Sequence, residues 1–523
     1  MINYWWVTRP KRKLNSVPEV LSTIVAISSA KEWSGQRDLH LSFEDSLEES
    51  NLKKKGERRD QGGGGARTYM AWLKSLGLLF KQNSTGKVFL TLAGEAIIAG
   101  KSPFDVLSYQ VLKYQFPSSY SLSRGVEVNP DYRVHPFWFL LKLLSDSRIR
   151  HLSQEEIAKT VITYGYTDAD RCYESVVETI KRFRESGDAS LPADFDSLFA
   201  PGKGGRDGDP YGHLLDTANT FINWLDYTRL IVREDGEIRI SPDKVAFVTD
   251  LVSKPLPFVD RPEDEEFYQR KYGLDPWHKK DTRDLTHSGT ITDTIIAENK
   301  ISQAFFSESL KRPIYRIDVA LIDTISSLTG YDVHQVEDVL QKKFANKTLG
   351  TIDLFLANYR DMAFSSREKA TDFEKATVEI FSQVFGMSAK HVGPIGKTPD
   401  VLVLSDTSGF AGIIDNKAYS NYSISNDHHN RMVHNYIGDF GLYSGGTNLP
   451  LCFFSYIAGG FGPRINSEIQ AITDETGIAG SAIKVDNVIQ LVQSYDKLHF
   501  DHEKIKHIFS IGREAHLNDI ISC

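Results

Sequence analysis

The sequence predicts a multidomain α+β protein in which helix-and-hairpin domains precede an α/β domain. The chain has 523 residues, which is more than one hydrophobic core usually organises. Two stretches, 66–95 and 217–244, repeat the order helix, hairpin, helix. A third stretch, 368–417, places an amphipathic helix before a hairpin with charged residues at its open end. We expect four domains, and their predicted bounds are 1–150, 151–255, 256–365 (a helical spacer) and 366–523.

The composition is that of an ordinary soluble globular protein, with 41% hydrophobic and 25% charged residues. Only three cysteines are present, Cys172, Cys452 and Cys523, and none has the spacing of a zinc ligand set. This argues against a disulfide scaffold and fits a reducing cytosol. No apolar run approaches the roughly 20 residues that a membrane span needs, so we expect no membrane partner. The first residues also lack the apolar core of a signal peptide.

The charge is distributed unevenly along the chain. The net charge is −8, but residues 1–150 carry 22 Lys and Arg against 14 Asp and Glu, so that the remaining residues carry −16. A basic N-terminal part on an acidic protein can bind phosphate groups. It can equally be a locally basic surface that has no partner.

The first helix-and-hairpin stretch follows the glycines 62–65. The apolar spacing predicts a helix over 66–76 that Gly77 ends. Two β-rich runs, 78–81 and 87–91, then flank a turn at 83–86, and a second helix follows. A helix followed by a small hairpin is the outline of a winged helix, a relative of the helix-turn-helix that usually binds DNA.

The second stretch has the same order. A helix over 217–227 precedes the runs 230–232 and 238–240, and the turn between them contains Asp235-Gly236, a strong hairpin signal. Two copies favour winged-helix domains in both N-terminal segments, although winged helices also serve as protein–protein modules.

Five basic residues on these elements are candidates for DNA contacts. Arg and Lys side chains can read guanine edges in the major groove. Most such residues instead contact phosphate or only water. The candidates are Arg67 and Lys74 on the first helix, Lys87 on its hairpin, and Arg229 and Arg239 in the second copy.

The C-terminal hairpin carries the chemistry. The apolar runs 401–404 and 412–414 flank the turn-forming residues 405–409. Asp400 stands where the first strand begins. Asp415 and Lys417 stand two apart on the second strand, so their side chains project from the same face.

Two carboxylates and an ammonium group at one hairpin suggest a metal site. The carboxylates can hold a hard divalent cation, and the lysine can orient or help deprotonate a water molecule. Alternatively, Asp400 caps a turn after Pro399. Asp415 and Lys417 would then be a surface ion pair that contributes little.

The preceding helix, 368–385, adds a third acid. Phe373, Ile380 and Phe381 belong to its apolar face. Glu374 lies about 80° from the centre of that face and Glu379 about 140°. We therefore expect Glu374 to turn toward the neighbouring sheet, unless it is merely solvated, and Glu379 to face water.

This order of helix, loop, Pro-Asp strand and Asp-x-Lys strand resembles the PD-(D/E)XK nuclease superfamily, and in particular the FokI-like cleavage domains of type IIS restriction endonucleases. The resemblance covers Phe373 to about Tyr436. The matching runs are Phe373-Glu374, Val384-Phe385-Gly386, Lys390-His391-Val392-Gly393, Lys397-Thr398-Pro399-Asp400 and Ile414-Asp415-Asn416-Lys417-Ala418-Tyr419-Ser420. Asn421-Tyr422-Ser423 replaces the glycines that follow in that family, which we expect to affect a loop only. The N-terminal half resembles the AlwI/BstNBI group through Asp105-Val106-Leu107, Lys113-Tyr114-Gln115-Phe116-Pro117-Ser118 and Val128-Asn129-Pro130.

The resemblance implies a type IIS restriction endonuclease, cytoplasmic and prokaryotic. Its segments 1–150 and 151–255 would recognise a short asymmetric sequence in double-stranded DNA. The domain 366–523 would hydrolyse phosphodiester bonds a fixed distance away with Mg²⁺. Asp400, Asp415 and the main-chain carbonyl of Asn416 would bind the metal, and Lys417 would position or activate the attacking water.

One such site cuts one strand at a time, so the resemblance also implies a partner. The expected partner is a second copy, in a transient homodimer formed through the cleavage domain, or a small partner subunit. A strand-specific nicking enzyme and the large subunit of a heterodimeric nuclease are alternatives with the same chemistry. A DNA-binding regulator without catalysis is an alternative of another class, and the intact Asp400, Asp415 and Lys417 argue against it.

Overall fold

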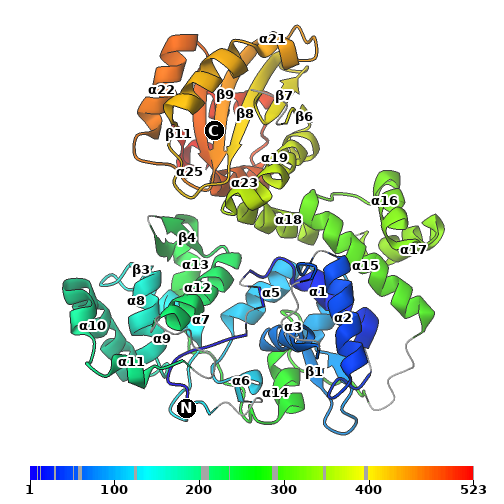
Figure 1. Cartoon of the computed structure of the whole chain (residues 1–523), viewed down its shortest axis with the longest axis vertical. Helices are drawn as coiled ribbons and strands as arrows, with labels where there is room; N and C mark the ends of the chain where they lie inside the picture. Colours follow the sequence, from blue (N-terminus) through cyan, green and yellow to red (C-terminus); the bar gives the residue numbers. More distant parts are fainter. Residues whose placement is uncertain are drawn as a thin grey trace. The chain divides into compact units, whose positions relative to one another are not determined.

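A computed structural model of the chain describes residues 1–8, 10–11, 13–28, 31–50, 52–56, 62–122, 127–201, 211–234, 236–285, 292–345, 349–393 and 398–521. The protein has mixed α/β structure and divides into two compact units (Figure 1). The N-terminal unit contains Met1–Phe306 and Arg316–Gly350, and the C-terminal unit contains Ser307–Tyr315 and Thr351–Cys523. Three residues named in the sequence predictions, Asp235, Lys397 and Cys523, lie outside the described residues. Within the described ranges, no helix is long and apolar enough to cross a membrane.

The N-terminal unit is mainly helical. Its helices are α1 (Val17–Ser28), α2 (Arg37–Glu49), α3 (Gly64–Ser75), α4 (Leu92–Ile98), α5 (Pro103–Leu112), α6 (Ser119–Leu122), α7 (Pro136–Ser145), α8 (Gln154–Glu156), η1 (Ile157–Val161), α9 (Ile162–Tyr164), α10 (Asp170–Ser186), η2 (Gly187–Ser190), α11 (Phe195–Leu198), α12 (Gly212–Tyr227), η3 (Pro242–Lys244), α13 (Val245–Val252), α14 (Glu265–Tyr272), α16 (Val319–Thr329) and α17 (Val333–Phe344). Its strands are β1 (Leu79–Lys81), β2 (Val88–Leu90), β3 (His151–Ser153), β4 (Ile231–Glu234) and β5 (Glu237–Ile240). Helices α15 (Asp293–Lys311) and α18 (Leu349–Met362) each contribute residues to both units.

The first predicted helix-and-hairpin stretch is confirmed as α3, β1, β2 and α4. Strands β1 and β2 are antiparallel, with Phe80 opposite Phe89. Gly77 follows α3 with a φ of 68°, a left-handed conformation that glycine adopts without steric cost. Trp72 on α3 is fully buried, so the helix is anchored in the core of the unit.

The second predicted hairpin is also confirmed, as β4 and β5 after α12. A third strand that the sequence analysis did not predict, β3, pairs antiparallel with β5 and gives the sheet order β3-β5-β4. Helix α7 packs against both α12 and α13. The predicted boundary at residue 150 therefore does not separate two cores, because α7 precedes that boundary and α12 follows it.

The segment predicted as a helical spacer, 256–365, is divided between the two units. Its first helix, α14, packs against β1 and α6 in the N-terminal unit. Tyr268 and Tyr272 are fully or almost fully buried there. Two large aromatic side chains on one short helix explain this, because they are stable only when a core covers them.

The C-terminal unit contains a six-stranded mixed sheet of order β11-β10-β9-β8-β7-β6. Strands β6, β7 and β8 are antiparallel neighbours, whereas β8, β9, β10 and β11 run parallel. The strands are β6 (Ser388–His391), β7 (Val401–Ser405), β8 (Phe410–Lys417), β9 (Leu451–Ala458), β10 (Ala479–Lys484) and β11 (Glu514–Ala515). The helices, besides parts of α15 and α18, are η4 (Ser366–Lys369), α19 (Ala370–Glu379), η5 (Ile380–Val384), α20 (Asn426–Asn430), η6 (Arg431–Ile437), α21 (Phe440–Tyr443), α22 (Ile465–Thr476), α23 (Val485–Ser494), α24 (His502–Phe509) and α25 (Leu517–Ile521).

Helices cover both faces of this sheet. Helices α18, α19, α23 and α24 pack on one face and enclose a core that includes Val401 and Ile414. Helices η6 and α22 pack on the other face, over a core that includes Leu402 and Ile413 (Figure 1). Consecutive strand residues thus enter opposite cores, as the two-residue period of a strand requires. The sheet is the middle layer of three.

Candidate active site

The predicted hairpin is present and aligns the two acids at its open end. In the antiparallel pair β7 and β8, Val401 lies opposite Ile414. Asp400 directly precedes this pair and Asp415 directly follows it. The main-chain N–H of Asn416 donates to Oδ2 of Asp400 over 2.7 Å. This bond ties the start of β7 to the end of β8.

Asp415 and Lys417 form a close ion pair on one face of β8, as their spacing predicts. Lys417 Nζ lies 2.6 Å from Asp415 Oδ2, and the side chains are 15% and 3% exposed. The other carboxylate oxygen of Asp415, Oδ1, is buried and accepts no hydrogen bond within the described part of the chain. A low exposure and an unsatisfied carboxylate oxygen distinguish this pair from a surface ion pair.

The charges of the site influence one another strongly. Burial and then the negative charge of Asp415 raise the pKa of Asp400 well above its usual range. Burial acts to lower the pKa of Lys417, but the charges of Asp415 and Asp400 outweigh it, and the pKa lies above its ordinary value. Lys417 is therefore a cation at neutral pH, which suits it to hold a water molecule or a phosphate oxygen rather than to accept a proton.

Three tyrosines form one wall of the site. Burial and then the charge of Asp415 raise the pKa of both Tyr422 and Tyr436. The pKa of Tyr456 is also raised, mainly by burial and then by the charges of Tyr422 and Asp415. The Tyr422 hydroxyl lies 2.8 Å from Nδ1 of His428. These rings exclude water from one side of the carboxylates and thereby strengthen their interactions.

The histidines after the hairpin have separate partners. His428 contacts Tyr422, and burial followed by the charge of Lys417 lowers its pKa. His429 Nε2 lies 2.9 Å from Oε2 of Glu475. The two adjacent rings thus have different partners.

The opposite face of β8 looks toward α19. Asn416 Nδ2 donates to the Thr377 hydroxyl over 2.7 Å. Glu374 stands one turn earlier on α19, and its Oε2 lies 2.7 Å from His391 Nε2. Its charge is felt by both Asp400 and Lys417. Glu374 is therefore near the site but is held by His391, which lies on β6 opposite Val401.

The expectation that Glu379 faces water is wrong. Glu379 is half-buried, and burial raises its pKa. The charge of Arg312 lowers this pKa and the charge of Glu308 raises it, both with smaller effects than burial. Arg312 and Glu308 come from the short segment Ser307–Tyr315 that belongs to the C-terminal unit. A helical angle predicts the sheet-facing side of α19, but it cannot reveal that a distant segment covers another side.

The donor set at the hairpin fits a divalent cation. It contains two carboxylates. The pKa of Asp400 is raised by burial and by the charge of Asp415, and Oδ1 of Asp415 has no hydrogen-bond partner in the described residues. A cation would relieve both conditions. In the described ranges no cluster of three or more His, Cys, Asp or Glu side chains could hold a metal. The two carboxylates would thus need main-chain or water oxygens to complete the set, and the Asn416 carbonyl is the predicted one.

The five predicted DNA-contact residues all lie in the N-terminal unit, in different settings. Arg67 is exposed on α3, and its Nη1 donates to the Gly62 carbonyl over 2.5 Å. Lys74 Nζ lies 2.5 Å from Oε1 of Glu265, and both side chains are less than one-fifth exposed. The ammonium of Lys74 is thus directed at α14, and a phosphate would have to compete with Glu265.

The remaining three candidate residues lie in different surroundings. Lys87 is half-buried at the start of the second strand of its hairpin. The Arg229 guanidinium lies 4.5 Å from the centre of the Phe104 ring. Arg239 lies on β5, and its Nη2 donates to Oε2 of Glu237 over 3.2 Å. The printed contacts of these five side chains are with different partners, whereas the hairpin brings Asp400, Asp415, Asn416 and Lys417 together.

His391 and Tyr436 also belong to the site, although no local pattern predicted them. His391 stood inside a matching run, but nothing local indicated that it meets Glu374, which lies 17 positions away along the chain. Tyr436 lies on η6, whose approach to Asp415 depends on packing over the sheet. An apolar face with a tyrosine would have been the only local signal.

Comparisons with known proteins find similarity over part of the chain. Residues 330–516 match the family model described as FokI, cleavage domain. The type II restriction enzyme StsI of Streptococcus sanguinis is 24% identical over 152 residues, which cover 27% of this chain and 25% of StsI. The chain thus spans about a quarter of that curated relative.

Restriction endonucleases also occur among solved structures of low similarity to this chain. One is a structure of restriction endonuclease FokI. The match covers 99% of this chain and 100% of that chain, with 13% identity and a TM-score of 0.29. Another is the BpuJ1 endonuclease binding domain in complex with pyrene- and phenanthrene-modified DNA. The match covers 51% of this chain and 96% of that chain, with 15% identity and a TM-score of 0.36. Residues 330–516 are thus the part of the chain that is similar to the FokI cleavage domain.

Proposed function

We propose that the chain is a type IIS restriction endonuclease. Its N-terminal unit would bind a short asymmetric sequence in double-stranded DNA. Its C-terminal domain, 366–523, would hydrolyse phosphodiester bonds at a fixed distance outside that sequence. The observation that carries the proposal is the buried cluster of Asp400, Asp415 and Lys417 within residues that match the FokI cleavage domain.

The chemistry follows the PD-(D/E)XK pattern. Asp400, Asp415 and the Asn416 carbonyl would hold Mg²⁺, whose charge would offset the negative charge that develops on the phosphate in the transition state. Lys417, kept cationic by two carboxylates, would donate to the attacking water or to a phosphate oxygen and fix its position. Glu374 would orient the surroundings of Asp400 through its charge and its bond to His391.

Winged helices would carry out recognition. The order β3-β5-β4, with α12 before the β4–β5 hairpin, supports this interpretation of the second copy. The first copy has α3 before the β1–β2 hairpin. Arg67 and Lys87 would contact DNA in the first copy, and Arg229 and Arg239 in the second. Lys74 is the weakest of the five candidates because Glu265 engages it.

The number of sites sets the stoichiometry of cutting. One Asp400–Asp415–Lys417 cluster serves one strand, so cleavage of both strands requires a second cluster. A transient homodimer formed through the cleavage domain would supply it, and a small partner subunit is the alternative.

The test is digestion of supercoiled plasmid with Mg²⁺ by the full chain and by its Asp415→Ala variant. Linear product at one position, absent from the variant and with EDTA, supports the proposal. Open circles alone indicate a nicking enzyme or a subunit that lacks its partner. Binding of plasmid without cutting by either protein would overturn the endonuclease and favour a regulator.

A further inference from the structure

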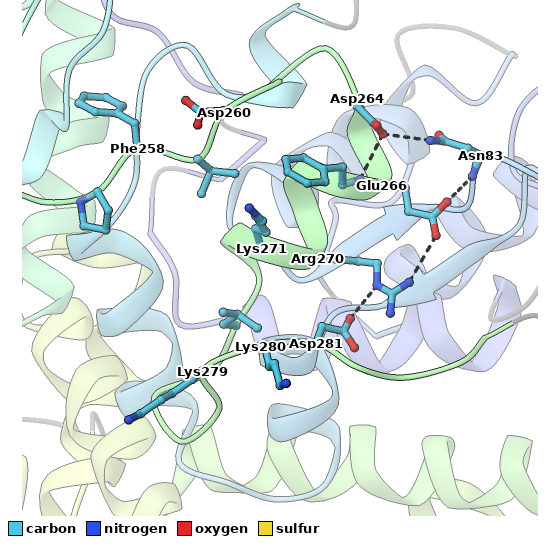
Figure 2. Close-up of a pocket in the computed structure, with 14 residues that line it drawn as sticks. Asn83, Phe258, Asp260, Asp264, Glu266, Arg270, Lys271, Lys279, Lys280 and Asp281 are labelled. Carbon is cyan, nitrogen blue, oxygen red and sulfur yellow. Dashed lines mark hydrogen bonds and ion pairs between the residues drawn. The ribbon is translucent and has the colours of Figure 1, made fainter.

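A cavity of about 630 Å³ lies in the N-terminal unit beside the first hairpin. It is bounded by α14, by the segment 257–260, by residues 279–281 and by Asn83 at the turn between β1 and β2 (Figure 2). Phe258 and Phe267 supply part of its apolar lining. None of these residues belongs to the contacts proposed above for DNA.

The acidic residues on one side of the cavity are already engaged. Asp264 and Glu266 accept hydrogen bonds from the side chain and main chain of Asn83, over 3.0 and 2.7 Å. Arg270 pairs with Asp281 over 2.9 Å and with Glu266 over 3.6 Å. Figure 2 shows these bonds as one connected network on that side. Arg283 also pairs with Asp281, over 2.8 Å, so each of these carboxylates is held by a donor, although carboxylates outnumber guanidinium groups in the network.

Three lysines at the same cavity take no part in this network. Lys271, Lys279 and Lys280 are exposed, and none forms an ion pair with a residue in the described ranges. Lys271 Nζ lies 4.5 Å from the centre of the Phe267 ring, an interaction that leaves its charge in place. In Figure 2 no interaction line reaches the three ammonium groups. The cavity thus has three ammonium groups at its rim that hold no carboxylate in the described ranges. Asp260, the remaining acid of the lining, lies 3.4 Å from Arg133.

The loop that carries two of these lysines is held rigidly. Asp275 is 3% exposed, and its Oδ1 accepts from the main-chain N–H groups of Trp277 and His278 over 2.9 Å each. His278 Nδ1 lies 2.8 Å from the same oxygen. Lys113 Nζ donates to the Leu274 carbonyl over 2.6 Å and fixes the start of the loop.

This rigid loop exposes an aromatic ring beside the cations. Trp277 is 49% exposed, and Lys101 Nζ lies 5.1 Å from the centre of its ring. A half-exposed tryptophan on an ordered loop, followed closely by two lysines, is suited to binding a charged and partly apolar chain. Sugar rings alternating with phosphates form such a chain.

We propose that Lys271, Trp277, Lys279 and Lys280 form a docking surface for the sugar–phosphate backbone of duplex DNA. The lysines would contact phosphates as point charges, and Trp277 would pack against deoxyribose. The surface adds sequence-independent affinity and fixes the orientation of the duplex on the first helix-and-hairpin stretch. This inference rests on the proposed function, because it requires that the N-terminal unit binds DNA.

The test measures how salt weakens binding. The full chain and its Lys271→Gln/Lys279→Gln/Lys280→Gln variant are titrated onto a labelled duplex of about 40 base pairs in EDTA, between about 50 and about 200 mM NaCl. Removing one lysine–phosphate interaction makes the slope of log K against log salt less negative by about 0.9. Three such interactions amount to about 2.7, so the wild type should lose about 40-fold more affinity than the variant over this range.

A matched variant controls for net charge. Lys181→Gln/Lys254→Gln/Lys342→Gln removes the same charge from the same unit, but each of these lysines pairs with a carboxylate, namely Glu178, Asp250 and Glu298. The control should keep the wild-type slope. Equal slopes for the two triple variants would overturn the inference and leave the endonuclease intact, whereas a wild type that binds no duplex would overturn both.

A second measurement does not depend on variants. Acetic anhydride modifies exposed lysines, and mass spectrometry of the wild type with and without the duplex reveals which of them DNA protects. Protection of Lys271, Lys279 and Lys280, with Lys254 modified equally in both samples, supports the surface. Equal modification of all four would contradict it.

Discussion

Replacing Lys417 by methionine should destabilise the metal-free C-terminal unit as well as abolish cleavage. Methionine keeps much of the side-chain volume but removes the charge that neutralises Asp415. At the 2.6 Å separation of Nζ and Oδ2, and with an effective dielectric constant of about 20, the attraction is about 6 kcal/mol. Desolvation offsets part of it, and the loss of one partner from a buried pair costs about 3–5 kcal/mol.

The cost should be large here because Asp415 is buried and Lys417 is the only cation paired with it in the described residues. Asp415 is 3% exposed, and its Oδ1 is already unsatisfied within the described residues. For a domain of this size, each kcal/mol lowers the unfolding midpoint by about 2–4 °C, so the midpoint should fall by about 6–20 °C. Thermal unfolding of the full chain in EDTA measures the shift. Hydrogen–deuterium exchange of peptides from β7 and β8 assigns it to this unit.

The double variant Asp415→Asn/Lys417→Met is the decisive control. It removes both charges, so it should regain most of the stability that Lys417→Met loses, while cleavage stays absent. If Lys417→Met is as stable as the wild type, the pair contributes nothing and behaves as a surface ion pair. If the double variant is as unstable as the single one, side-chain packing rather than charge explains the loss.

Three further predictions concern neighbouring residues. Burial and Asp415 raise the pKa of Asp400, so its contribution to the stability of the metal-free fold falls as pH rises from the ordinary aspartate range through the raised pKa. Asp400→Asn should flatten this pH dependence, measured by thermal unfolding in EDTA, and should stabilise the protein at pH 7. It should also lower cleavage by about 10²–10³-fold or more. A steeper pH dependence of the variant's stability would contradict the raised pKa of Asp400. Glu374→Gln should lower cleavage by only about 10–100-fold and raise the Mg²⁺ concentration needed, because Glu374 acts from beside the site; a loss as large as that of Asp400→Asn would make it a ligand. Lys74→Ala should lower the free energy of unfolding by about 1–3 kcal/mol, because it removes the cation beside the largely buried Glu265, which then keeps only the main-chain N–H of Lys81. It should change the affinity for duplex DNA less than Arg67→Ala does. The reverse order in a binding titration would restore Lys74 as a DNA contact.

Local periodicity was sufficient to predict the hairpin and the pairing of its charges. Asp415 and Lys417 stand two apart in a β-rich run, and the two-residue period of a strand alone puts them on one face. The turn residues 405–409 set the register that places Asp400 beside Asn416. The same reasoning found both N-terminal hairpins, since turn chemistry and alternation are properties of adjacent residues.

The parts that the sequence did not reveal depend on distant contacts. Asp415 is buried because β9 pairs in parallel with β8 and because Tyr456, on β9, closes one side. Lys74 meets Glu265, which lies 191 positions away, and no local pattern encodes that contact. Glu379 is covered by the segment Ser307–Tyr315 for the same reason.

The turn of the β7–β8 hairpin and the acidic residues lie at opposite ends of the hairpin. The acids lie at the open end, whereas the turn after Ser405 leaves Asp406 and Thr407 exposed, and Gly409 turns the chain with a φ of 67°. Ser405 and Phe410 are the last paired residues before that turn, so the strand register is complete without the loop. A fluorescent reporter or a short peptide inserted after Ser408 would therefore be carried by the sheet without altering the spacing of the carboxylates, which makes this turn an attachment point for following single molecules of the protein on DNA.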